Sequence, residues 1–157
     1  LDTIEDLKNG VVKRVAQDNS LSTYAGKITK EDCLIHFTNH AKTVHNQIRG
    51  LSPVPLAFTH TPDGKLLKVI EAKPVTLPPD AAFAAPGEIV SLSDGRITVA
   101  CGTPSCGTSA CENIDCPNRN AVREGVALLR VLPEGKGRMS AADFMNGRKV
   151  KVGEILS

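Results

Sequence analysis

The sequence is poor in aromatic residues, with no Trp, one Tyr and four Phe among 157 residues. This scarcity disfavours binding of single-stranded nucleic acid by base stacking on aromatic side chains. No apolar run approaches the roughly 18 residues that a membrane-spanning helix needs, so no membrane partner is expected. A secretory leader, with a charged start and an apolar middle, is also missing. The five cysteines are an odd number, which argues against a complete disulfide framework.

Motifs that mark familiar catalytic centres are missing as well. The chain has no nucleophile elbow, no phosphate-binding loop and no HExxH sequence. Asp32 and His36 lie close together in sequence, but no visible pattern positions an Asn beside them. We therefore predict no catalytic residue in this chain.

Charge is distributed unevenly, although the formal net charge is only +2. Leu1–Ser20 carries three cations against four anions, whereas Arg130–Lys151 carries six cations against two anions. A polyanion would be attracted to the C-terminal part, because affinity depends on where the charge lies and not on its sum.

Helical spacing appears in three places. Leu1–Gly10 has apolar residues every third position, but a helix this short needs a partner surface. A second helix has the one-face apolar pattern Ala41, Val44, Ile48 and Leu51, with Thr38 or Asn39 as the expected N-cap and prolines beyond its end. In the third, Ser140 is expected to cap a short helix, with Asp143 completing an acidic capping box.

Short strands separated by turns make up most of the remaining chain. Thr61-Pro62-Asp63-Gly64 and Ser93-Asp94-Gly95 are typical hairpin turns. Lys27–Phe37 suggests a further strand, and Pro74–Pro86 a loop. Five or six such strands, with helices, predict a mainly β fold: a small open antiparallel barrel of the OB type, in which closure removes exposed edges.

Four cysteines recur every fifth residue in or beside a loop expected over residues 102–124. They are Cys101, Cys106, Cys111 and Cys116. Four thiolates can bind a structural zinc ion, although ligand pairs usually lie two to four residues apart. A disulfide pair or simple loop thiols remain as alternatives.

Three motifs resemble the C-terminal domain of the methionyl-tRNA formyltransferase family. They are Y-A-G-K-I-T-K-E-D at Tyr24–Asp32, H-N-Q-I-R-G-L-S-P-V-P at His45–Pro55, and L-P-E-G-K-G-R-M-S-A-A-D-F-M-N-G-R at Leu132–Arg148. The third motif is the most specific. The resemblance covers nearly the whole chain apart from the cysteine loop.

The resemblance implies an OB-like barrel over residues 24–157, preceded at 1–23 by the last helix of the catalytic domain and a linker. Its partners would be initiator methionyl-tRNA and the N-terminal catalytic domain. The parent enzyme uses 10-formyltetrahydrofolate in translation initiation, in the bacterial cytoplasm or an organelle, and this chain itself would bind no cofactor. The family's catalytic Asn, His and Asp lie upstream, so no position here inherits them.

The resemblance has three departures. Val54 stands where the family usually has Trp, Leu34–Phe37 replaces R-I-D-W, and residues 103–124 replace a tight turn. Two alternatives therefore stay open: a domain of another formyltransferase or dehydrogenase that uses 10-formyltetrahydrofolate, and a zinc-binding structural module.

We expect electrostatic docking of tRNA phosphates by exposed cations, against the simpler interpretation that these cations are only solvated. The candidate residues are Lys27, Lys30, Arg49, Lys136, Arg138, Arg148, Lys149 and Lys151.

Overall fold

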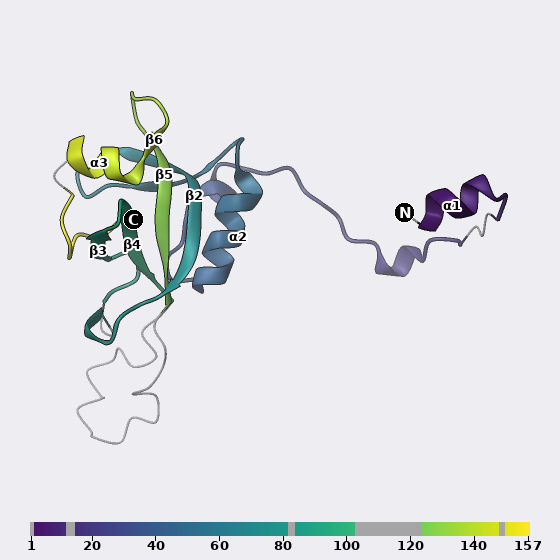
Figure 1. The fold of residues 1–157 in the computed structure, drawn as a ribbon, viewed down its shortest axis with the longest axis horizontal. Coiled ribbons are helices and arrows are strands. Elements are labelled where there is room, and N and C mark those ends of the chain that lie inside the picture. The colour runs from purple at the N-terminus through teal and green to yellow at the C-terminus, as the bar shows by residue number, and fades with distance from the viewer. Residues whose placement is uncertain (1, 12–14, 82–83, 103–123, 148–149) are drawn as a thin grey trace, which may run out of the picture.

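An antiparallel sheet forms the body of the protein in the computed structural model, which describes residues 2–11, 15–81, 84–102, 124–147 and 150–157. Its strand order is β1-β2-β5-β4-β3, with the short β6 also paired to β5 (Figure 1). The strands are β1 (Ala57–His60), β2 (Leu66–Thr76), β3 (Ile89–Ser93), β4 (Arg96–Cys101), β5 (Glu124–Pro133) and β6 (Met139–Ser140). The helices are α1 (Asp2–Lys8), α2 (Ala41–Leu51) and α3 (Ala141–Gly147), with single 3-10 turns η1 (Asn19–Leu21), η2 (Glu31–Cys33) and η3 (Pro79–Ala81).

Both predicted hairpin turns are confirmed. Gly64 in the β1–β2 turn has a φ of +77°. Asp94 and Gly95 connect β3 to β4 with φ values of +53° and +69°. Two consecutive residues with positive φ are the signature of the turn whose twist matches that of paired strands, and Asp-Gly is among its preferred sequences.

Helix α2 lies along β2 with its predicted stripe buried (Figure 1). Val44 and Ile48 are almost fully excluded from solvent. His45, which follows Val44, connects the helix to the sheet, because its Nδ1 lies 3.0 Å from the Ala72 carbonyl oxygen. One cluster of buried side chains joins this stripe to the inner face of the sheet and to Phe144 of α3. The core therefore forms where two helices cover the sheet.

The sheet is not closed into the expected barrel. In the part of the chain that the structure describes, the edge strands β1 and β3 form no ladder with each other. A C-terminal strap, residues Gly153–Ser157, bonds to both edges instead. On the β3 side Leu156 N–H donates to the Gly87 carbonyl at 2.8 Å, and on the β1 side Ser157 and His60 exchange backbone hydrogen bonds of 3.1 and 2.6 Å.

Two predicted elements differ in the structure. Lys27–Phe37 contains η2 and a single parallel bridge between Leu34 and Phe58 in place of a strand. Strand β2 also continues through Pro74, which the sequence assigned to a loop. Pro74 is tolerated because β1 pairs with β2 only as far as Val69, so the missing N–H of Pro74 faces no second strand.

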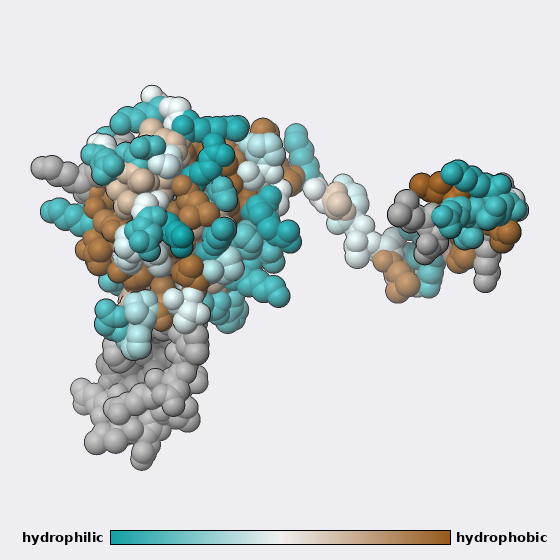
Figure 2. Space-filling model, viewed as in Figure 1, coloured by the Kyte–Doolittle hydropathy of each residue, from teal (hydrophilic) through white to brown (hydrophobic). Residues whose placement is uncertain are grey.

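The N-terminal segment extends away from the sheet (Figure 1). Helix α1 forms as predicted, but its apolar side chains Ile4 and Leu7 are exposed. Val15 and Leu21 farther along are exposed too, and apolar side chains are visible along this segment in Figure 2. Among the described residues, no helix has the length and apolar character needed to cross a membrane.

The strap's contribution to stability can be measured at Gly87. This residue has a φ of +87°, and a Cβ there would clash with the Leu156 carbonyl oxygen. We expect Gly87→Ala to lower the free energy of unfolding by the left-handed strain of about 1–2 kcal/mol and by about 1–3 kcal/mol more for the overlap. Urea unfolding would measure both effects.

Gly64→Ala is the matched control, because Gly64 has a similar φ of +77° and nothing within 4 Å of the added Cβ. It should show the backbone strain alone. Equal losses in the two variants would mean that the strap does not stabilise the sheet edges.

Candidate nucleic-acid interface

Six of the eight predicted tRNA-binding cations fall within the described residues, and all six are exposed. They are Lys27, Lys30, Arg49, Lys136, Arg138 and Lys151, whereas Arg148 and Lys149 lie outside the described residues. None of the six forms an ion pair with a described carboxylate. Their charge is therefore available to an external anion.

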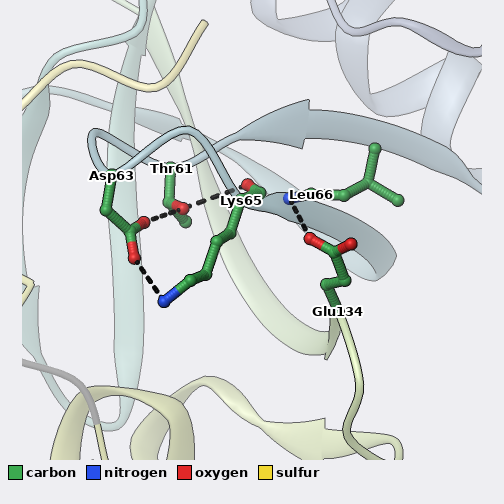
Figure 3. A network of polar contacts seen from close by, with 5 residues as sticks. All are labelled: Thr61, Asp63, Lys65, Leu66 and Glu134. Carbon is green, nitrogen blue, oxygen red and sulfur yellow. Dashed lines mark hydrogen bonds and ion pairs between the residues drawn. The ribbon is translucent and has the colours of Figure 1, made fainter.

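The β5–β6 turn presents Lys136 and Arg138. Lys136 N–H donates to the Pro133 carbonyl at 3.2 Å, and Gly135 adopts a φ of +70°, so the turn is tight. Its acidic residue, Glu134, is occupied elsewhere: a carboxylate oxygen lies 3.3 Å from Leu66 N, which donates to it (Figure 3). Glu134 N–H also donates to the Leu66 carbonyl at 3.0 Å. These bonds fix the base of the turn to β2.

The neighbouring β1–β2 turn uses its own charges internally. Lys65 Nζ lies 3.1 Å from an Asp63 carboxylate oxygen, and Thr61 Oγ1 is within hydrogen-bonding range of Asp63 and of the Lys65 carbonyl (Figure 3). The charge of Lys65 is thus balanced by Asp63 within the same turn. It provides a natural reference for the unpaired cations.

The predicted cap of α3 is confirmed. Asp143 N–H donates to Ser140 Oγ at 3.1 Å, and the Ser140 hydroxyl donates to the Asp143 carboxylate at 2.7 Å. Ala141 and Phe144 anchor the helix in the core. The Asp143 charge is therefore directed at the helix N-terminus.

The remaining cations belong to separate segments. Arg49, near the end of α2, donates from Nε to Asn46 Oδ1 at 2.9 Å. Lys30 immediately precedes η2, and Lys27 lies three residues before Lys30. Lys151 N–H donates to the Glu154 carboxylate at 3.0 Å in the C-terminal turn. Backbone hydrogen bonds therefore fix the segments that carry several of these cations. Among the described residues, no hydrogen bond connects one of these cations to another.

Glu124 has a role that the sequence did not reveal. The residue before α2 is His40, which provides no side-chain cap, so the expected Thr38 or Asn39 cap is wrong. Ala41 N–H donates instead to a Glu124 carboxylate oxygen at 3.1 Å, and His40 Nδ1 lies 2.8 Å from the other oxygen. A carboxylate at a helix N-terminus satisfies the free N–H groups and the helix dipole. No local pattern could show a cap 83 residues away.

Cys101 is the one predicted zinc ligand within the described residues, since Cys106, Cys111 and Cys116 lie outside them. Its side chain is 1% exposed and belongs to the core cluster. Burial, with a smaller contribution from the nearby Glu124 carboxylate, raises the pKa of the Cys101 thiol to about 12. Zinc binds the thiolate, so ligation by Cys101 requires removal of a strongly held proton. Among described side chains, no three His, Cys, Asp or Glu residues are grouped to hold a metal.

These features define a mainly β domain that presents unpaired cations from its turns. Residues 27–149 match the family model described as formyl transferase, C-terminal domain, and the chain belongs to this family. The predicted resemblance is confirmed.

Relatives named methionyl-tRNA formyltransferase match almost the full chain. The Citrifermentans bemidjiense protein is 33% identical over 155 residues, covering 99% of this chain and 41% of the relative. The Bacillus subtilis protein is 31% identical over 155 residues, covering 99% and 42%. The chain therefore spans about two fifths of these relatives. HypX from Aquifex aeolicus shares the fold, with a TM-score of 0.55 at 17% identity over 92% of this chain and 22% of HypX.

The raised pKa of Cys101 predicts low reactivity. At pH 8 its thiol stays protonated in the folded protein, because its pKa is about 12. We expect iodoacetamide to leave the Cys101 peptide unmodified, as measured by mass spectrometry, and to modify it in urea. Rapid modification in the native protein would contradict the buried, protonated thiol.

The four-cysteine zinc site stays a prediction. It requires about one zinc per chain in purified protein, measured by elemental analysis. Cys101→Ala tests whether the core thiol takes part: a zinc content reduced by this change would assign it as a ligand, and an unchanged content would exclude it. A zinc content near zero in the unmodified chain would contradict the site.

Proposed function

We propose that this chain is the tRNA-docking part of an enzyme that formylates initiator methionyl-tRNA with 10-formyltetrahydrofolate. The observation that carries the proposal is the match of 155 residues, 99% of the chain, to proteins named methionyl-tRNA formyltransferase. In this proposal, formyl transfer and cofactor binding belong to a catalytic domain, and the chain alone has no transferase activity. The setting would be translation initiation in a bacterial cytoplasm or an organelle.

The electrostatics of the turns support the docking role. Glu134 and Asp143, the two acidic residues among the C-terminal cations, direct their carboxylates to Leu66 N–H and to Ser140. Lys136 and Arg138 consequently keep their full charge for phosphates. Neutralising phosphates releases condensed counterions, which supplies affinity without base recognition.

Phosphate contacts of this kind set the position of the tRNA and carry little sequence information. The domain would therefore orient the acceptor arm, while selection of the initiator tRNA would lie mainly with the catalytic domain. The low aromatic content agrees with this division, because base stacking has few side chains to use.

A salt titration tests the proposal. If about five phosphate contacts form, the logarithm of the tRNA association constant should fall with log salt with a slope of about −3.5 to −4.5. Filter binding of initiator tRNA to the 157-residue chain measures this slope. Lys136→Gln and Arg138→Gln should each reduce its magnitude by about 0.7–0.9.

Lys65→Gln is the matched control. It removes the same charge from a neighbouring turn, but Lys65 is already paired with Asp63 at 3.1 Å. We expect its slope to equal that of the unmodified chain. A slope near zero for the unmodified chain would refute the docking role and favour a formyltransferase that does not serve tRNA.

A further inference from the structure

Lys30 lies in a turn whose shape is fixed by its own residues. Asp32 turns back on Thr29, and its Oδ2 accepts from Thr29 N–H at 2.8 Å and from Thr29 Oγ1 at 3.0 Å. Cys33 N–H donates to the Lys30 carbonyl at 3.1 Å, which forms the 3-10 turn η2. These bonds are local, so they determine the conformation of the turn but not its direction relative to the domain.

Gln47 on α2 is one of the contacts that connect this turn to the rest of the domain and so limit its direction. Gln47 Nε2 donates to the main-chain oxygens of Asp32 and Leu34, each at 2.9 Å. Both protons of the amide are thereby used on residues two and four positions after Lys30. The buried Cys33 side chain and the Ile35 N–H bond to the Phe58 carbonyl, 2.8 Å, hold the next residues to the core.

The direction in which the turn presents Lys30 affects phosphate binding, because the turn also carries acidic residues. Glu31 and Asp32 follow Lys30, and hydrogen bonds hold the pKa of both carboxyls below their ordinary values, through the Glu31 backbone N–H and the Thr29 backbone N–H respectively. Both are therefore ionised beside the Lys30 ammonium. An isolated lysine can bind a phosphate that approaches from many directions. A lysine followed by two carboxylates attracts a phosphate only when the ammonium lies between the phosphate and these carboxylates.

We propose that Gln47 is a positioning residue that directs Lys30 toward the phosphates of the bound tRNA and keeps Asp32 turned away from them. This role rests on the proposed tRNA docking and deepens it. Gln47 does not itself contact the tRNA. It acts on Lys30 through the two carbonyls, so its effect on binding should disappear when Lys30 is removed.

A double-mutant cycle tests this dependence. Gln47→Leu keeps most of the side-chain volume and removes the amide, and Lys30→Gln removes the charge. Each single change should weaken tRNA binding about twofold to fivefold, the magnitude of an exposed ion pair, and reduce the salt slope by about 0.7–0.9. The double variant should bind no more weakly than either single variant.

Arg49→Gln provides the matched control. Arg49 is two residues beyond Gln47 and so projects from a different face of α2. Its effect on binding should add to that of Gln47→Leu. Gln47→Glu is a second variant that keeps the shape of the side chain but replaces both donors with acceptors facing carbonyls, so it should resemble Gln47→Leu or bind more weakly. Thermal unfolding identifies any variant that has lost the fold.

The possible outcomes separate the two proposals. Additive effects of Gln47→Leu and Lys30→Gln, or unchanged binding by Gln47→Leu, would overturn the positioning role while the docking role stands. A loss that couples equally to Arg49 and to Lys30 would indicate general damage to α2 and would also overturn it. Absence of salt-dependent binding by the unmodified chain would overturn both proposals.

Discussion

Burial of β5 between β2 and β4 is the constraint on which the other elements depend. Gly125 shows how closely these strands approach, because a Cβ there would lie 2.6 Å from the Val99 carbonyl oxygen and 2.7 Å from Leu77. The two ends of this strand then organise opposite parts of the domain. Glu124 caps α2 at one end, and Pro133 leads into the turn that carries Lys136 and Arg138 at the other. The central ladder thus positions a helix and a basic turn together.

Features with a local cause could be predicted from the sequence. The Asp94-Gly95 turn, the buried stripe of α2 and the Ser140–Asp143 cap each depend on residues that lie close together in the sequence. All three form in the structure. Features with distant partners could not be predicted. The strap that replaces barrel closure joins Ser157 to His60, and the cap of α2 joins Ala41 to Glu124. Propensity and spacing contain no information about such pairs.

The residues of the candidate interface also separate into those that the sequence could predict and those that it could not. Residue types were enough to nominate Lys136, and the structure adds that its acidic neighbour Glu134 is bonded to Leu66. The even spacing of the cysteines did not indicate that Cys101 is buried in the core, because spacing along the chain does not show which face of a sheet a side chain occupies. Gln47 had no signal at all in the sequence, since a glutamine on a helix is usually solvated and its two acceptors are main-chain atoms of another segment.

Cys101 and Glu124 are direct partners in the β4–β5 ladder, so the two ends of the connection between these strands lie at neighbouring positions of the sheet. Gly102 N–H is also held by the Phe37 and Asn39 carbonyls, at 2.9 and 3.0 Å. A connection anchored in this way can change in length at little cost, because loop-closure entropy grows only slowly with the number of residues. The β4–β5 junction is therefore a suitable place to graft a reporter domain without altering the register of the sheet.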